Sequence, residues 1–291
     1  MTKIPTIKPN NEEDTSRFMH AEEWTKTWHN PQFDVRIMRA FYIEHAFPRH
    51  SHEYYVICLI KRGLQSFTHK GTKHFTPADG LIVINPDVVH TGEAADANGF
   101  EMVCLYPTIA HMQQAAFELT GRRQALPFFA EVRIDHPWTI KNILAMHHAL
   151  EQKSNPLEAE SRFVWTLAQL IKHYADVRYT EQPLGHERKA VRQARRYIDT
   201  HYDQGVNLTQ LADHVALSPY YLLRVFRAEV GMPPHTYQDS VRINHAQRLI
   251  KSGKSMAEVA FEVGYSSQSH LTNRFKQIIG VTPGQYAHQL R

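Results

Sequence analysis

The sequence predicts an α+β protein of two domains, an N-terminal antiparallel β-barrel followed by helices and a C-terminal all-α domain. Between residues 33 and 106, short runs rich in Val, Ile, Phe and Tyr are separated by Gly, Pro, Asp and Asn. After Pro107, apolar residues instead recur at three- and four-residue spacing. The last third of the chain also contains one helical unit twice. A chain of 291 residues is long enough for two domains.

The overall composition is that of an ordinary globular protein. The hydrophobic fraction is 42% and the charged fraction 21%, which argues against a disordered chain. No apolar run reaches the roughly 18 to 20 residues needed to cross a bilayer, and the polar N-terminus is unlike a signal peptide. We therefore expect a cytoplasmic protein without membrane attachment. Cys58 and Cys104 lie in apolar strand-like runs, where two buried, reduced thiols are expected.

The strand-like segments are residues 33–46, 53–63, 64–76, 80–86 and 101–107. Lys70-Gly71 is a predicted hairpin tip and residues 77–80 a predicted tight turn. Strands at such spacing without intervening helices indicate an antiparallel barrel or sandwich. Amphipathic helices are predicted over residues 108–120, 138–152 and 157–177. These helices either cap the barrel or pair with a second copy of the chain, and we expect a homodimer through the last two.

Residues 178–187 have the Pro, Gly and charge content of a linker. The predicted domains are therefore residues 1–180, helical from about residue 108, and residues 185–291. From residue 184 to 291 there are 14 Lys and Arg against 8 Asp and Glu, a net charge of +6. Residues 1–183 have 19 Lys and Arg against 21 Asp and Glu, a net charge of −2. This asymmetry fits a polyanion-binding module joined to a nearly neutral domain.

The repeat in the C-terminal part is visible as matched residues at a fixed distance. Five pairs are 49 residues apart: Phe226 and Phe275, Gly231 and Gly280, Pro234 and Pro283, Tyr237 and Tyr286, and Arg242 and Arg291. Upstream, three pairs are 48 apart: Ala212 and Ala260, Val215 and Val263, and Ser218 and Ser266. The second copy therefore has one extra residue between these blocks.

Each copy has the pattern of a helix-turn-helix unit. In the first, a short helix over 208–215 is followed by a turn, the N-cap Ser218 and a helix from Pro219 to residue 229. In the second, helices over 256–263 and 267–278 flank a turn in which Gly264 suits a left-handed residue and Ser266, the counterpart of Ser218, is the expected N-cap. A long helix over 233–252 joins the copies. It would set their second helices in successive major grooves, about one DNA turn (~34 Å) apart.

Residues 190–291 resemble the DNA-binding domain of the AraC/XylS family of bacterial transcription regulators, most closely in AEVAFEVGYSSQSHLTNRFKQIIGVTPGQY. In that family both second helices lie in major grooves of an asymmetric site. The resemblance implies that base-reading side chains face outward, namely Tyr220, Leu223 and Arg224 in the first copy and Gln268, Ser269 and Asn273 in the second. Arg227, Arg274 and Lys276 are expected either to contact DNA phosphates or to pack against the domain.

The N-terminal part carries a group of histidines. His50-Ser51-His52 followed by His90 resembles the metal motif of cupin barrels, so these three residues are the candidate metal ligands. Metal-binding cupins add a Glu shortly after the second His, where Val56 and Ile57 stand here. We therefore predict no metal and no other cofactor.

The segments FPRHSHEYYVICLIKRGLQSFTHKG and INPDVVHTGEA resemble the cupin-like effector-binding domain of the same regulator family. The resemblance implies a small-molecule pocket, and histidines with a purely structural role are the alternative. The polar residues expected to line it are Arg49, His50, His52, Tyr54, Asn85, His90 and Tyr106.

The resemblance implies an effector-responsive transcription regulator, an activator rather than an enzyme. Its expected partners are double-stranded DNA, RNA polymerase and a small effector such as an amino acid, a sugar or another metabolite. Two alternatives stay open. One is a metal-dependent cupin enzyme with an accessory helical domain. The other is a ligand-independent DNA binder whose barrel serves only for dimerisation.

Overall fold

The computed structural model describes residues 22–151, 155–176 and 179–289. Contacts divide them into two compact units, the first comprising residues 22–29, 34–106 and 132–135 and the second residues 30–33, 107–131 and 136–289. The helices after residue 107 thus share a unit with the C-terminal helices, and the functional boundary near residues 180–185 stays a prediction. Gln152, Val177 and Arg178, at the ends of predicted segments, lie outside the described residues, as does the polar N-terminal stretch.

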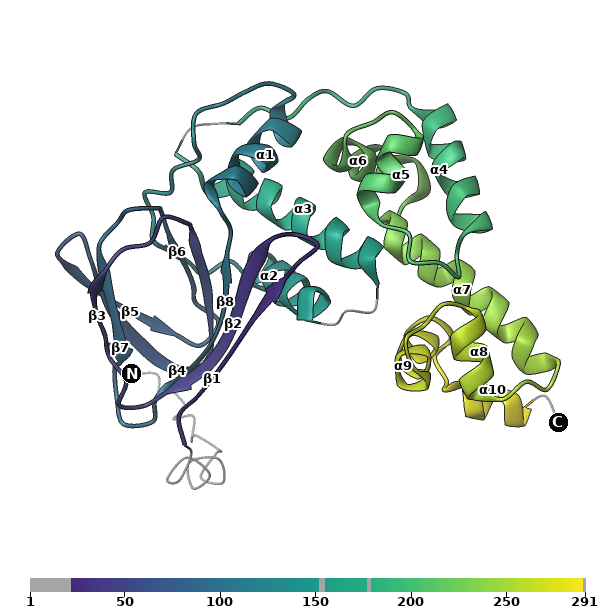
Figure 1. The fold of residues 1–291 in the computed structure, drawn as a ribbon, viewed down its shortest axis with the longest axis horizontal. Coiled ribbons are helices and arrows are strands. Elements are labelled where there is room, and N and C mark those ends of the chain that lie inside the picture. Colours follow the sequence, from purple (N-terminus) through teal and green to yellow (C-terminus); the bar gives the residue numbers. More distant parts are fainter. Residues whose placement is uncertain (1–21, 152–154, 177–178, 290–291) are drawn as a thin grey trace, which may run out of the picture. The chain divides into compact units, whose positions relative to one another are not determined.

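The first unit is an antiparallel β-structure (Figure 1). Its strands are β1 (Trp24–Asn30), β2 (Val35–Tyr42), β3 (Phe47–His50), β4 (Val56–His69), β5 (Thr72–Pro77), β6 (Leu81–Ile84), β7 (His90–Ala94), β8 (Phe100–Tyr106) and β9 (Arg133–Ile134). The main order is β1-β2-β8-β4-β6-β9, and β5 and β7 also pair with β4, while β3 pairs with β7. All five predicted regions contain strands, although the predicted break between residues 63 and 64 is absent because β4 runs across it. Strands β1, β3, β7 and β9 were not predicted.

Strand β4 connects the two parts of the barrel. Its first half pairs with β6 and β8 and its second half with β5 and β7. The change of partner strands takes place beside Gly63, whose φ is +77°. An added Cβ at Gly63 would lie 1.9 Å from the carbonyl oxygen of Gly99. Only glycine fits there. The predicted hairpin tip is confirmed, because Lys70 and Gly71 both have positive φ between the paired ends of β4 and β5.

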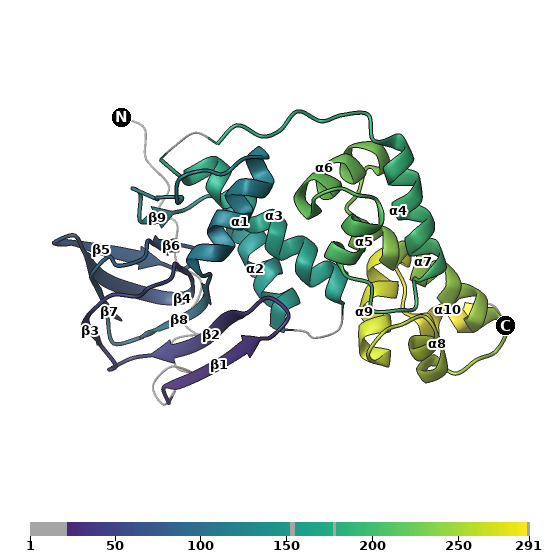
Figure 2. The same ribbon diagram turned by 45° about the horizontal axis from the view of Figure 1, so that its top comes forward.

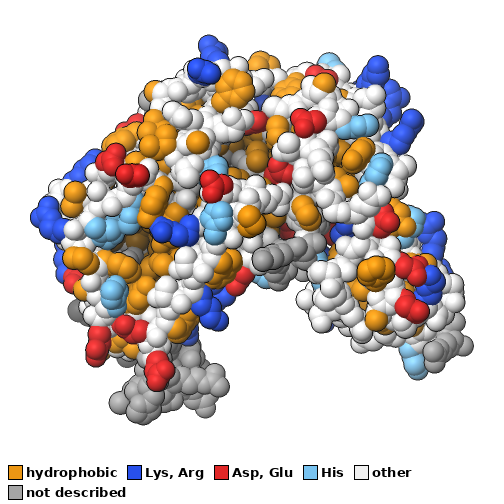
Figure 3. Space-filling model, in the orientation of Figure 1, with side chains coloured by type: hydrophobic (Ala, Val, Ile, Leu, Met, Phe, Trp, Pro, Cys, Tyr) orange, Lys and Arg blue, Asp and Glu red, His pale blue; other side chains and the backbone are white. Residues whose placement is uncertain are grey.

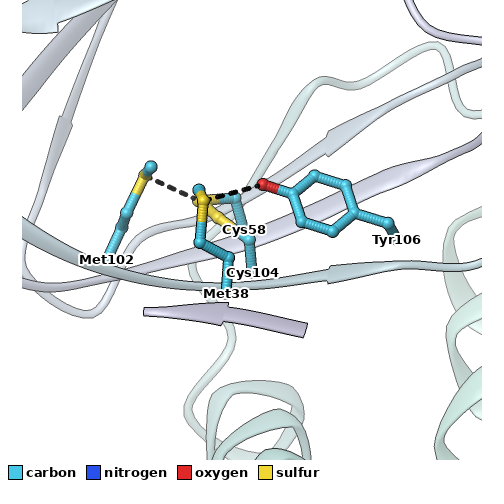
Figure 4. Close-up of a disulfide and its surroundings, with 5 residues drawn as sticks. All are labelled: Met38, Cys58, Met102, Cys104 and Tyr106. Carbon is cyan, nitrogen blue, oxygen red and sulfur yellow. Dashed lines mark hydrogen bonds between the residues drawn. A yellow bond between two sulfur atoms is a disulfide. The ribbon is translucent and has the colours of Figure 1, made fainter. Parts of the chain in front are cut away.

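The prediction of two reduced thiols is wrong. Cys58 on β4 and Cys104 on β8 are joined by a disulfide (Figure 4). The two strands are neighbours, and their register places these residues directly opposite each other, with Cα atoms 4.1 Å apart. Both side chains are buried, and the Sγ of Cys58 lies 3.5 Å from the Sδ of Met102. Burial was predicted correctly, but the pairing of the two strands cannot be read from either segment alone.

The second unit is helical (Figures 1 and 2). Its helices are α1 (Ile109–Thr120), α2 (Pro137–Glu151), α3 (Pro156–Tyr174), α4 (Arg188–Thr200), α5 (Leu208–His214), α6 (Pro219–Val230), α7 (Pro234–Lys251), α8 (Met256–Glu262), α9 (Gln268–Ile279) and α10 (Pro283–Gln289). The predicted helices are confirmed to within one residue at their described ends, except that α3 ends at Tyr174, three residues before the predicted end, whereas α4 and α10 were not predicted. In the described parts of the chain, no helix is both long and apolar enough to cross a membrane.

The two copies of the repeat form the pairs α5–α6 and α8–α9. The first helices begin after the N-caps Asn207 and Ser255, which are 48 residues apart. The second helices begin after Ser218 and Ser267, which are 49 apart, so the extra residue of the second copy lies in its turn. The predicted cap Ser266 is therefore wrong by one position. Both turns start with a left-handed residue, Ala216 with φ +54° in the first copy and Gly264 with φ +82° in the second, as predicted for the latter.

Candidate effector pocket and nucleic-acid interface

The barrel encloses a cavity of about 360 Å³. Its apolar wall includes side chains that alternate on the inner face of the strands, among them Val56, Cys58, Phe67, Ile82 and Met102. Its polar lining includes five of the residues predicted from sequence: His50, His52, Tyr54, His90 and Tyr106. A mostly apolar cavity with a few convergent polar groups has the character of a small-molecule site.

Two predicted pocket residues do not line this cavity. Arg49 is exposed and lies along a different hollow with Lys70 and Thr91, because it alternates with His50 on β3 and its side chain takes the opposite face. Asn85 is buried directly after β6 but does not line the cavity either. For these two residues the predicted position is wrong.

The three histidines meet at the mouth of the cavity. Their ring centroids lie 4.4 to 5.2 Å apart, and their candidate ligand atoms all lie within 4.8 Å of one another. His50 Nδ1 is 2.7 Å from the carbonyl oxygen of Pro48, and His90 Nδ1 is 2.9 Å from that of Val88. Since a carbonyl only accepts, both Nδ1 atoms carry a proton and donate it.

Burial, with the neighbouring His50, His90 and Arg36, lowers the pKa of His52 to about 4. Burial also lowers the pKa of His90. Both rings are therefore neutral near pH 7. Three imidazoles fit a borderline divalent metal, although no carboxylate of the described residues joins the group, and the absence of a metal remains a prediction.

Arg36 is a pocket residue that the sequence did not reveal. Its guanidinium lies 4.9 Å from the ring centroid of Tyr54 and 4.3 Å from that of Tyr106, and it donates a hydrogen bond to the Tyr54 hydroxyl. The two tyrosine rings, which lie edge to face, hold this cation at the edge of the cavity. In the sequence, Arg36 is one of several basic residues near predicted strands and does not stand out. Only the register of β2 against β8, which sets Arg36 opposite Tyr106, places it in the pocket.

Gln65 on β4 was also missed. The side chain is 7% exposed, lines the cavity, and its Oε1 has no hydrogen-bond partner among the residues that the structure describes. A buried acceptor without a partner lowers the stability of the fold by about 1 to 3 kcal/mol. A ligand that donates a hydrogen bond to Gln65 Oε1 would recover this free energy as binding affinity.

The candidate DNA contacts of the second copy are on the surface. Gln268, Ser269, Asn273 and Lys276 are exposed on α9, while Leu271 and Phe275 on its other side are buried. The predicted outward direction of these four side chains is confirmed. Their contact with DNA stays a prediction.

The first copy differs, and its predicted exposure is wrong for the principal residues. Tyr220 is 0% and Leu223 3% exposed. The Tyr220 hydroxyl donates to Glu181 at 2.5 Å and accepts from Gln169 of α3 at 2.8 Å, and its backbone N–H donates to Glu118 of α1 at 3.0 Å. Helix α6 thus turns its predicted outer face toward α1 and α3.

Arg224 is also held within this unit, with its side chain only 12% exposed. It donates to the backbone carbonyl of Gln182 at 2.6 Å and lies 3.4 Å from the Glu181 carboxylate. Arg227, one turn further on, is exposed, and its guanidinium lies 5.5 Å from the ring centroid of Trp165. Periodicity identified one outer face of α6 correctly, but it could not show that other helices cover that face.

Comparison with known proteins places the chain in a family. Residues 32–167 match the model of the AraC-like ligand binding domain, and residues 211–289 match that of a helix-turn-helix domain. The HTH-type transcriptional regulator YbfI of Bacillus subtilis is 30% identical over 243 residues, which cover 83% of this chain and 87% of YbfI. The chain belongs to the AraC family of transcription regulators.

Two further proteins are similar to this AraC-family regulator. The HTH-type transcriptional activator RhaS of Pectobacterium atrosepticum is 24% identical over 258 residues, covering 84% of this chain and 88% of RhaS. The C-terminal domain of AraT, a response regulator from Geobacillus stearothermophilus, is 32% identical with a TM-score of 0.34, covering 37% of this chain and 88% of that one.

Helix α3 of the AraC-family regulator also contacts both helix-turn-helix units through carboxylates. Glu160 accepts hydrogen bonds from the backbone N–H groups of Leu208 and Thr209, at the N-terminus of α5. Glu158 pairs with Arg274 of α9, which also lies 3.5 Å from Asp239 of α7. Burial alone would raise the pKa of Glu158, but the nearby Arg274 and other positive groups hold it below its usual value.

A basic surface on α4 was not predicted from the sequence either. Lysine and arginine side chains gather over this helix (Figure 3). Five basic residues within its 13 positions are exposed: Arg188, Lys189, Arg192, Arg195 and Arg196. This density of basic residues in one segment was the available signal, and such a surface suits contact with phosphates.

Proposed function

We propose that this AraC-family regulator is an effector-responsive transcription activator that binds an asymmetric DNA site with both helix-turn-helix units of one polypeptide. The observation that carries this proposal is the pair α5–α6 and α8–α9, similar in their caps and turns but different in the residues of their second helices. Two units with different side chains read different base pairs, so the site needs no internal symmetry. The description of RhaS as an activator supports the activating role.

In the present conformation only one of the two second helices is free on its predicted DNA face. Tyr220 and Leu223 are buried, whereas Gln268 and Asn273 are exposed. Binding through both units therefore requires α6 to separate from α1 and α3. An effector that favours the separated state raises the fraction of molecules able to bind the full site.

The barrel cavity is the proposed effector site. His52 and His90 are neutral, Arg36 supplies a positive charge, and Gln65 offers a buried acceptor without a partner among the described residues. This combination favours a small metabolite that carries both a hydroxyl or amine donor and an anionic group. The proposal also includes contact with RNA polymerase, dimerisation through α2 and α3, and action in the cytoplasm, where chromosomal DNA lies.

The test is a genome-wide binding map of the full chain with and without candidate metabolites, followed by binding measurements on the selected site. We expect Arg224→Ala and Gln268→Ala each to weaken specific binding by about 1 to 3 kcal/mol and to relax preference at different base pairs, roughly one helical turn apart. The proposal fails if both substitutions affect the same base pair, or if no discrete sites are bound.

A second candidate function is a metal-dependent cupin enzyme, which the convergence of His50, His52 and His90 favours. Metal analysis of the purified protein separates the two functions. Stoichiometric iron or manganese together with turnover of a small substrate would replace the regulator proposal, whereas metal-free protein that retains effector-dependent DNA binding would support it.

A further inference from the structure

The helical unit contains a second cavity, of about 210 Å³, apart from the barrel pocket. Its lining comes from α3 through Ser161 and Trp165, from α6 through Leu223 and Arg227, and from the start of α7 through His235. At ~30 Å³ for each water molecule, this volume corresponds to several waters or one small organic molecule.

Two polar groups of this lining lack partners. Ser161 is 1% and His235 7% exposed, and neither Ser161 Oγ nor His235 Nδ1 has a hydrogen-bond partner in the part of the chain that the structure describes. Buried polar atoms are nearly always paired in folded proteins, with protein, water or ligand. Two such atoms on one cavity therefore point to an occupant with hydrogen-bonding capacity.

The lining also indicates the charge and shape of the occupant. Among its described residues are two arginines and no Asp or Glu. Arg162 is paired with Glu158 at 2.9 Å, but Arg227 forms no ion pair with any described residue and instead lies over the Trp165 ring. Trp165 and Leu223 supply apolar surface beside this unpaired cation.

We propose that this cavity is a ligand site for a small carboxylate with a flat or branched apolar body. The carboxylate pairs with Arg227, the body packs on Trp165 and Leu223, and the buried polar atoms of Ser161 and His235 supply the remaining contacts. Because the site is built from α3, α6 and α7 together, its ligand binds only while α6 is packed on α3.

This arrangement makes the ligand an antagonist of DNA binding, a consequence that rests on the proposed function of α6. DNA requires α6 to leave α3, and the ligand requires it to stay. The two therefore weaken each other's binding by the same factor. The barrel effector and the second ligand would act in opposite directions on one equilibrium.

The site is tested with benzoate as the probe and benzamide as its neutral counterpart. The full chain is labelled with 5-fluorotryptophan, and the ¹⁹F resonance of Trp165 is assigned from the Trp165→Phe variant. We expect benzoate to shift this resonance saturably, with a Kd on the order of 1 mM or tighter. Benzamide should have little effect. A shift confined to Trp24 and Trp28 of β1, or an equal response to benzamide, would overturn the proposal.

The variants are Arg227→Gln and, as a matched control, Arg123→Gln, which removes an exposed arginine of the same unit. We expect Arg227→Gln to weaken benzoate binding by about tenfold or more, and Arg123→Gln to leave it unchanged. Equal affinity in Arg227→Gln and wild type would show that the cation does not hold the ligand, and the assignment would be wrong.

The antagonism is measured separately, with a labelled fragment of the selected DNA site. Saturating benzoate, but not benzamide, should weaken DNA binding several-fold. If the Trp165 resonance responds to benzoate while the affinity for DNA is unchanged, the ligand site is supported, but the proposed antagonism between ligand and DNA is wrong. If no DNA site is found at all, the proposed function fails, while the Trp165 titration still decides on the ligand site.

Discussion

Glu181→Gln should increase the affinity of the chain for its DNA site, because Glu181 holds α6 in its covered position. Its carboxylate accepts from the Tyr220 hydroxyl at 2.5 Å and lies 3.4 Å from Arg224 and 2.8 Å from Lys172. Burial alone would raise the pKa of Glu181, but hydrogen bonds from Lys172 and Tyr220 hold it below its usual value, so it is ionised at neutral pH.

The size of the effect follows from these contacts. Replacing the ionised carboxylate by an amide weakens charge-assisted hydrogen bonds, and allowing for the 20% exposure of the side chain this amounts to about 1 to 2 kcal/mol. The state in which α6 packs on α1 and α3 loses this stabilisation, whereas the state in which α6 has separated from them does not. Apparent DNA affinity should therefore rise about 5- to 30-fold.

The assay is fluorescence anisotropy with the selected DNA site at one fixed salt concentration, since salt alone changes such affinities strongly. Glu131→Gln, which neutralises an exposed carboxylate in the same unit, serves as the control for net charge. Unchanged or weaker binding by Glu181→Gln, in a protein whose circular dichroism and Tm match wild type, would refute the conclusion that these contacts restrain α6.

Three further predictions concern separate parts of the molecule. Lys276→Ala should weaken binding to all DNA sequences and reduce the steepness of the plot of log binding constant against log salt concentration by about 0.9. Gln268→Ala should instead relax the preference at one base pair and leave this slope nearly unchanged. DNA titrations at several salt concentrations measure both effects. Because the folded pKa of His52 is depressed to about 4 from 6.5, the unfolded state binds more protons between these values. Its contribution to stability is present above pH 6.5 and is lost as the pH falls toward 4, so urea unfolding of His52→Gln should depend less on pH there than wild type. Replacing both Cys58 and Cys104 by Ser should lower the free energy of unfolding by about 2 to 4 kcal/mol under oxidising conditions, and an equal stability of wild type with and without reductant would contradict a disulfide.

Much of the fold could be predicted because its signals are local. The strand regions of the barrel, the hairpin at Lys70-Gly71 and the helices of the repeat follow from side-chain periodicity, turn residues and caps within single segments. Short strands such as β3 and β9 carry too few residues for a periodic signal. The misplaced cap in the second copy has a similar cause, since Ser266 and Ser267 are equally good caps and only the turn geometry selects between them.

The sites were predictable only in part. The histidines of the barrel pocket were found because three of them stand out in the sequence, but Arg36 and Gln65 were not, because an inward direction depends on strand register. Arg49, next to His50, was expected in the pocket, but on β3 the two residues alternate and its side chain takes the opposite face. On α9 the four predicted residues are exposed, and the contact of this helix with α3 is made by Arg274 instead.

By itself, the sequence determined the α+β class, the barrel strands, the doubled helical unit and thereby the regulator family, because each depends on patterns within a few tens of residues. Only the tertiary structure decided that Cys58 pairs with Cys104 and that Tyr220 and Leu223 are covered. Both outcomes depend on which segments pack against each other, and these lie tens of residues apart, Glu118 and Tyr220 by 102. A helix pattern shows which side chains share a face, whereas the partner of that face is set by the whole fold.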